Sequence, residues 1–174
     1  MMILLTGGSG CGKSAFAERL CARLPMPRTY VAAMRPFGEG GAEKIARHRA
    51  MRADKGFVTV ERYTDLAGLA LPARGTALLE CVCNLTANEM FDEAGNMTDP
   101  FERVTRGVDA LSAQCDHLIV VTNDVGSEPP LPAKSTNRYV AALGRVNCAL
   151  AARADVVCEL VCGIAIPIKG ELPI

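Results

Sequence analysis

The chain alternates short, continuous apolar runs with longer segments of helical periodicity. Apolar runs without polar alternation are typical of strands buried on both faces, as in parallel sheets. We expect strands over the ranges 3–6, 29–33, 57–60, 76–82, 118–122, 156–161 and 164–168. The spacing predicts helices over 14–24, 42–52, 100–114 and 139–153. This order predicts an α/β fold, a mostly parallel sheet flanked by helices, in one domain over residues 1–174.

The carboxyl ends of these predicted strands are the expected place for a ligand site, because open α/β sheets bind ligands there. These ends follow Thr6, Ala33, Leu79 and Thr122, and each carries polar or small residues. The segment 127–135 contains three prolines, which predicts an irregular connection.

The segment after the first predicted strand fills the pattern G-x-x-x-x-G-K-[ST] without departure. Its members are Gly7, Gly8, Ser9, Gly10, Cys11, Gly12, Lys13 and Ser14. Backbone N–H groups of such a loop surround phosphate oxygens, and the following helix adds partial positive charge. We expect Lys13 to bridge the outer phosphates and the Ser14 hydroxyl to bind Mg²⁺. The alternative is a glycine-rich turn without a ligand. The full motif in its strand–turn–helix context favours nucleoside triphosphate binding and a three-layer, RecA-like P-loop NTPase fold.

Two further strand ends carry polar residues beside this loop. Glu80 ends an apolar strand, where a carboxylate is expected to face Mg²⁺, its waters or the ribose. The alternative is a solvated carboxylate, but a charge in so apolar a run favours a functional role. The segment 123–126, Asn-Asp-Val-Gly, is equally compatible with an ordinary Asx turn and with a site.

His48 lies in a predicted helix that is rich in Lys and Arg. Such a field lowers the pKa of an imidazole and keeps the ring neutral and nucleophilic. From the residues alone, a surface histidine on a basic amphipathic helix remains the favoured interpretation. His117 precedes a buried strand and is expected to be structural.

Composition narrows the classes of function. The 174 residues carry 19 Lys and Arg against 19 Asp and Glu, so we expect no nucleic-acid partner. We expect neither a signal peptide nor a membrane span, because the apolar runs are too short, and we expect a cytoplasmic protein. None of the eight cysteines forms a C-x-x-C pair, so reduced thiols are expected rather than disulfides or a zinc site.

Several motifs, in order, resemble the bifunctional adenosylcobinamide kinase / adenosylcobinamide-phosphate guanylyltransferase family of cobalamin biosynthesis. They cover nearly the whole chain. The matching segments are 1–8 with the loop that follows, 30–33, 45–49, 59–61, 78–81 with Asn88, 121–126, Gly144 with Asn147, and 163–169.

The resemblance assigns roles that the residues alone leave open. It implies that His48 attacks the α-phosphate of GTP and holds GMP as a phosphoramidate, which a corrinoid phosphate then takes. The kinase step would pass a γ-phosphate from GTP or ATP to a hydroxyl of cobinamide, at the same loop and with Mg²⁺. The resemblance also implies a trimer. The nucleotide contacts that it implies outside the loop are Ala32, Ala33, Met34, Arg49, Ala50, Met51, Arg52, Glu61 and Glu80.

Two other functions stay open at this stage. One is a P-loop small-molecule kinase in which His48 only binds phosphate. The other is a nucleotide-binding regulatory module, because residues 137–141 read Asn-Arg-Tyr-Val-Ala where the family commonly has Arg-x-Phe-Arg-Asp.

Overall fold

A single seven-stranded sheet forms the centre of the computed structural model, which describes residues 1–35, 46, 55–92, 94–126 and 133–173. The strand order is β3-β2-β4-β5-β1-β6-β7. The strands are β1 (Met2–Thr6), β2 (Arg28–Ala32), β3 (Phe57–Glu61), β4 (Thr76–Glu80), β5 (His117–Val121), β6 (Val156–Val161) and β7 (Ile164–Lys169). All neighbours pair in parallel except β6 and β7, which form an antiparallel hairpin. The predicted mostly parallel sheet is confirmed.

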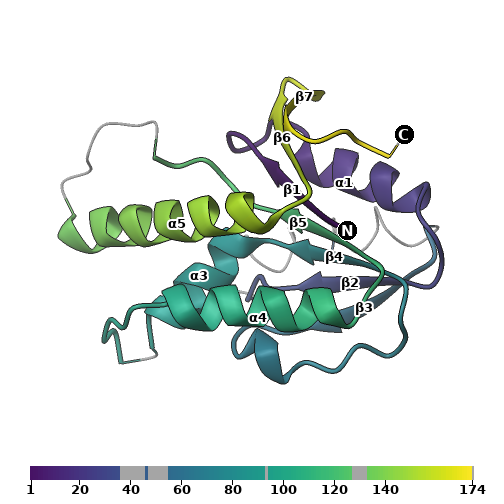
Figure 1. Cartoon of the computed structure of the whole chain (residues 1–174). Helices are drawn as coiled ribbons and strands as arrows, with labels where there is room; N and C mark the ends of the chain where they lie inside the picture. Colours follow the sequence, from purple (N-terminus) through teal and green to yellow (C-terminus); the bar gives the residue numbers. More distant parts are fainter. Residues whose placement is uncertain (36–45, 47–54, 93, 127–132, 174) are drawn as a thin grey trace.

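Helices cover both faces of the sheet (Figure 1). Helix α1 (Lys13–Ala22) lies on one face, and α3 (Val82–Met90), α4 (Phe101–Ala113) and α5 (Lys134–Arg153) lie on the other. Successive side chains of a strand point to opposite faces. Accordingly Ile3 packs in the cluster that contains α1, and Leu4 in the cluster that contains the other three helices. A short 3₁₀ helix, η1 (Leu66–Gly68), packs against α4.

The predicted elements differ from the structure at two places. The strand predicted over 76–82 ends at Glu80, and Val82 begins helix α3, which the sequence analysis did not predict. Val82 and Cys83 continue the apolar run, but the chain turns there, and helix α3 buries Leu85 and Met90. Helix α5 begins at Lys134, five residues before the predicted start, because residues 133–153 contain no proline.

The predicted helix over 42–52 lies outside the described residues apart from Ala46, which is helical. Within the described part of the chain, no helix is both long and apolar enough to cross a membrane. All eight cysteines are free thiols, as predicted.

Candidate nucleotide site at the carboxyl edge of the sheet

The sheet register brings the predicted strand ends side by side. Ala32 pairs with Glu61 on one side and with Glu80 on the other, and Glu80 pairs with Val121. Parallel pairing places all of these carboxyl ends at one edge, where the loop after β1 also leaves the sheet (Figure 1).

Glycine is required at several positions of the loop 7–14. Gly7 has φ +136° and Gly12 has φ +97°, a region that side-chain-bearing residues rarely adopt. A Cβ on Gly7 would lie 2.5 Å from the carbonyl oxygen of Leu160. The turn between β6 and β7 also holds the loop, because the Gly163 N–H donates to the Cys11 carbonyl at 2.8 Å. The loop is therefore fixed against strand β6 and the following turn.

Lys13 turns back into this loop. Its Nζ donates to the carbonyl oxygens of Gly7 at 2.8 Å and Gly8 at 2.6 Å, and it lies 3.6 Å from the Cys11 sulfur. Lys13 is buried, so its ammonium group lies within the loop and not in solvent. A buried ammonium among backbone amides suits an incoming polyphosphate.

Ser14 and Glu80, the two residues predicted to face Mg²⁺, meet at the base of the loop. The Ser14 hydroxyl donates to Glu80 Oε1, and the Tyr30 hydroxyl donates to Glu80 Oε2 at 2.8 Å. Tyr30 is buried in β2, and its ring packs edge-on against Phe57. The sequence analysis placed Tyr30 in the matching segment 30–33 but assigned it no role in the site.

Oxygen donors at this place fit Mg²⁺, which typically takes one or two protein oxygens together with phosphates and waters. The Ser14 hydroxyl and the Glu80 carboxylate are such donors. In the described ranges, no group of three or more His, Cys, Asp or Glu residues is arranged to hold a metal ion by itself.

Helix α3 fixes the segments that follow β2 and β3. The Asn88 amide donates to the Ala33 carbonyl at 2.8 Å and to the Tyr63 carbonyl at 3.0 Å. Ala33 is buried, and its N–H donates to the Glu80 carbonyl. Glu61, at the end of β3, accepts a hydrogen bond from the Tyr63 hydroxyl. The predicted contacts thus lie at the carboxyl ends of three adjacent strands, where Ala32, Glu61 and Glu80 are the last strand residues and Ala33 and Met34 follow β2.

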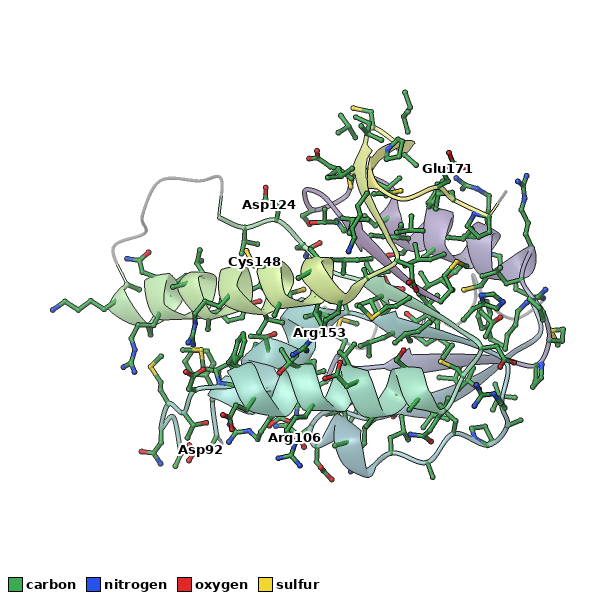
Figure 2. The ribbon with its side chains drawn as sticks, viewed as in Figure 1. Asp92, Arg106, Asp124, Cys148, Arg153 and Glu171 are labelled. Atoms are coloured by element: carbon green, nitrogen blue, oxygen red, sulfur yellow. The ribbon has the colours of Figure 1, made fainter. Side chains whose placement is uncertain are left out.

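The segment after β5 lies against the loop. The Asp124 N–H donates to the Gly7 carbonyl at 3.2 Å, and the Asp124 side chain projects above α5 (Figure 2). The Gly126 N–H donates to Asp124 Oδ1, so the Asx turn is present. Thr122 donates to Asn147 Oδ1 at 2.7 Å, and Asn147 in turn donates to the Asn123 carbonyl. Asn147 thereby connects helix α5 to the carboxyl end of strand β5.

Two cysteines, Cys81 and Cys83, lie within three residues after Glu80. The sulfurs of Cys81 and Cys83 lie 2.9 Å apart, and the side-chain amides of Asn84 and Asn123 donate to them. The hydrogen bond from Cys81 lowers the pKa of the Cys83 thiol, and the charge of Lys13 acts in the same direction. That same hydrogen bond and burial raise the pKa of Cys81. The sequence analysis assigned no role to this pair.

Five predicted site residues lie outside the described residues: His48, Arg49, Ala50, Met51 and Arg52. His117 is the first residue of β5. It therefore lies at the amino ends of the parallel strands, whereas the loop 7–14 lies at their carboxyl ends. Its position agrees with the structural role expected for it.

Comparison with known proteins shows the family of this chain. The family model described as cobinamide kinase / cobinamide phosphate guanyltransferase matches residues 3–168. The chain belongs to this family. It is 33% identical to the bifunctional adenosylcobalamin biosynthesis protein CobU of Escherichia coli (strain K12), over 97% of this chain and 100% of that protein. It is 29% identical to the bifunctional adenosylcobalamin biosynthesis protein CobP of Pseudomonas aeruginosa, over 98% of this chain and 99% of that protein.

A solved structure shows the same fold at a greater distance. An ATPase from the type III secretion system of pathogenic bacteria superposes with a TM-score of 0.50 at 10% identity. The match covers 91% of this chain and 50% of that one. At this identity the likeness shows the fold alone, and it agrees with the predicted fold class.

Proposed function

We propose that this chain is a cobinamide kinase and cobinamide phosphate guanylyltransferase of adenosylcobalamin biosynthesis. One observation supports it most strongly: Lys13 and the Ser14–Glu80 pair meet at the carboxyl edge of the sheet in a member of this family. The nucleotide substrates are GTP for guanylyl transfer and GTP or ATP for the kinase step. The corrinoid is the acceptor in both.

Lys13 is proposed to bind the β- and γ-phosphates. Its two hydrogen bonds to loop carbonyls would be replaced by bonds to phosphate oxygens, which keeps the buried ammonium paired throughout. The loop N–H groups and Lys13 then stabilise the charge that develops on the phosphates as a bond breaks.

Mg²⁺ is proposed to be held by Ser14 and Glu80, and when bound it neutralises charge on the phosphate oxygens. Tyr30 keeps the Glu80 carboxylate oriented toward Ser14 by holding its second oxygen. Ala32, Ala33, Met34 and Glu61, with residues 49–52, are proposed to complete the nucleotide contacts. The whole chain, residues 1–174, is proposed to act as one domain around the single sheet.

His48 is proposed as the nucleophile of guanylyl transfer. Its ring nitrogen attacks the α-phosphorus of GTP, a P–N bond forms, and pyrophosphate leaves. The phosphate of the corrinoid then attacks the same phosphorus and releases His48. A neutral imidazole suits both steps, because it is a good nucleophile and, once protonated, a good leaving group.

The test of this proposal is a labelling experiment with the purified chain, α-labelled GTP and Mg²⁺. We expect an acid-labile, alkali-stable protein adduct that disappears in His48→Ala. His117→Asn is the matched control, since His117 is the other histidine of the chain and lies at the amino end of β5, away from the loop 7–14. An unlabelled wild type, or equal labelling of His48→Ala, would overturn guanylylation at His48.

A second assay separates the kinase step from a binding function. Transfer of a γ-phosphate to cobinamide without any adduct would indicate a kinase alone. Binding without either transfer would indicate a regulatory module. Lys13→Ala is expected to lower transfer in both enzymatic cases by about 10²-fold or more, since it removes a group that stabilises the transition state.

We further propose that the chain forms a homo-oligomer, a trimer as the resemblance implies. Exposed isoleucines on the edge strand β7 support a partner surface: Ile164 is 68% and Ile166 is 45% exposed. Eight free thiols support a reducing, cytoplasmic setting.

A further inference from the structure

The thiols of Cys81 and Cys83 form a pair at the end of strand β4. Their sulfurs are 2.9 Å apart, whereas a disulfide bond measures about 2.05 Å. Both side chains already point at each other, so bond formation requires only a small local movement. The pair begins helix α3, with Cys81 as its N-cap residue.

The surroundings favour chemistry at these sulfurs. Asn84 donates to the Cys81 sulfur at 3.1 Å and Asn123 to the Cys83 sulfur at 3.4 Å, and amide donors stabilise negative charge on sulfur. Cys81 is half-buried and Cys83 keeps 8% of its surface exposed, so a small reagent can reach the pair, whereas Cys21 and Cys158 are fully buried.

We propose that Cys81 and Cys83 are an oxidation site that a hydroperoxide converts into an intramolecular disulfide. The Cys83 sulfur attacks the peroxide, an S–O bond forms, and the O–O bond breaks to release an alcohol or water. The Cys81 sulfur then attacks the Cys83 sulfur, the S–S bond forms, and the oxygen leaves as water with the Cys81 proton. Two thiols give up two electrons, and one hydroperoxide is reduced.

The disulfide acts on the neighbouring Glu80. This carboxylate is held by Ser14 and Tyr30, and it is covalently adjacent to Cys81. Movement of the Cys81 backbone toward Cys83 pulls Glu80 away from these partners. The oxidised chain is therefore expected to bind nucleotide with Mg²⁺ more weakly. This consequence rests on the proposed function, but the oxidation itself does not.

The test follows the thiols and the nucleotide separately. The full chain carries Cys148→Ser and Cys162→Ser, which remove the two exposed thiols and so prevent links between molecules; Cys148 lies on α5 (Figure 2). It is treated with hydrogen peroxide, blocked with N-ethylmaleimide and cleaved with trypsin. The tryptic peptide 75–103 contains Cys81 and Cys83 and no other cysteine.

We expect this peptide to carry two maleimides before oxidation. After oxidation it should carry none and have lost two hydrogen atoms, and dithiothreitol should restore the first state. Cys83→Ser should yield no disulfide, and Cys81→Ser gives the same test if that variant does not fold. Two maleimides after oxidation, a sulfinic acid at either position, or a link to Cys11 would overturn the proposal.

Binding of a fluorescent GTP analogue with Mg²⁺ measures the consequence. We expect the affinity to fall about tenfold or more on oxidation, as for loss of one hydrogen bond to a charged group, and to recover with dithiothreitol. In Cys83→Ser the peroxide should leave the affinity unchanged. Absence of binding in the reduced chain contradicts the proposed function alone, because the mass measurement does not depend on the nucleotide.

Discussion

Single residues in this site depend on neighbours that lie far away in the sequence. Ser14, Tyr30 and Glu80 come from the start of α1 and from two adjacent strands, yet one carboxylate joins them. The sequence motif predicts Ser14, and a charge at the end of an apolar run predicts Glu80. Tyr30 could not be predicted, because its contact exists only once β2 and β4 pair in register.

Tyr30→Phe tests this contact. The substitution removes only the hydroxyl and keeps the ring against Phe57, so Glu80 Oε2 loses a donor in a partly buried site. We expect the Mg²⁺ concentration needed for half-maximal nucleotide transfer to rise about three- to tenfold, which corresponds to about 1 kcal/mol. Titration of activity with Mg²⁺ measures it. Tyr63→Phe is the control for Mg²⁺ dependence, because it removes a hydroxyl that donates to Glu61, a carboxylate proposed to contact the nucleotide but not Mg²⁺. Equal Mg²⁺ dependence in wild type and Tyr30→Phe would contradict the positioning role.

Among the elements, the loop 7–14 is the one whose conformation the sequence predicts most directly. Its glycines satisfy a backbone requirement that other residues cannot meet, as the positive φ of Gly7, Gly10 and Gly12 shows. Helix α3 was missed for the opposite reason. Its first residues are apolar and β-branched or small, so they extend the strand pattern, and the turn after Glu80 carries neither glycine nor proline.

Gly7→Ala and Gly8→Ala form a matched pair for this element. A methyl group on Gly7 would meet the Leu160 carbonyl at 2.5 Å and would require φ +136°, whereas nothing lies within 4 Å of a Cβ on Gly8. We expect Gly7→Ala to lower the free energy of unfolding by about 2 kcal/mol or more, and Gly8→Ala to change it by less than about 0.5 kcal/mol. Denaturant unfolding monitored by circular dichroism measures both. Similar stability of the two variants would show that the loop adapts to a side chain.

At the scale of the whole molecule, the alternation of buried runs and helices was enough to predict a parallel sheet with two covered faces. Even and odd positions of β1 supply the two separate clusters, one beneath α1 and one beneath α3, α4 and α5. The edge strand β7 differs from the central strands in its exposure to solvent. Hairpin β6–β7 ends the sheet with apolar side chains that no helix in the described ranges covers.

This edge carries the prediction on assembly. Ile164 pairs with Val161 and Ile166 with Glu159, and directly opposed residues of antiparallel strands share a face. Val161, 43% exposed, therefore extends the surface formed by Ile164 and Ile166. Exposed apolar side chains gathered on one edge favour association, and strand edges are common sites of it. A self-associating chain would bury this surface against another copy.

Ile164→Lys with Ile166→Lys is expected to shift the chain from the proposed trimer toward a monomer. The added charges would have to be desolvated at an interface, which costs several kcal/mol, while both positions remain solvated in the separate chain. Light scattering coupled to size-exclusion chromatography measures the mass, and circular dichroism establishes that the variant is folded. Val58→Lys is the control, since Val58 is similarly exposed at 53% but lies on β3, at the far edge of the sheet. A wild-type monomer, or a trimer that survives both lysines, would place any assembly surface elsewhere; loss of the trimer in Val58→Lys alone would assign it to β3.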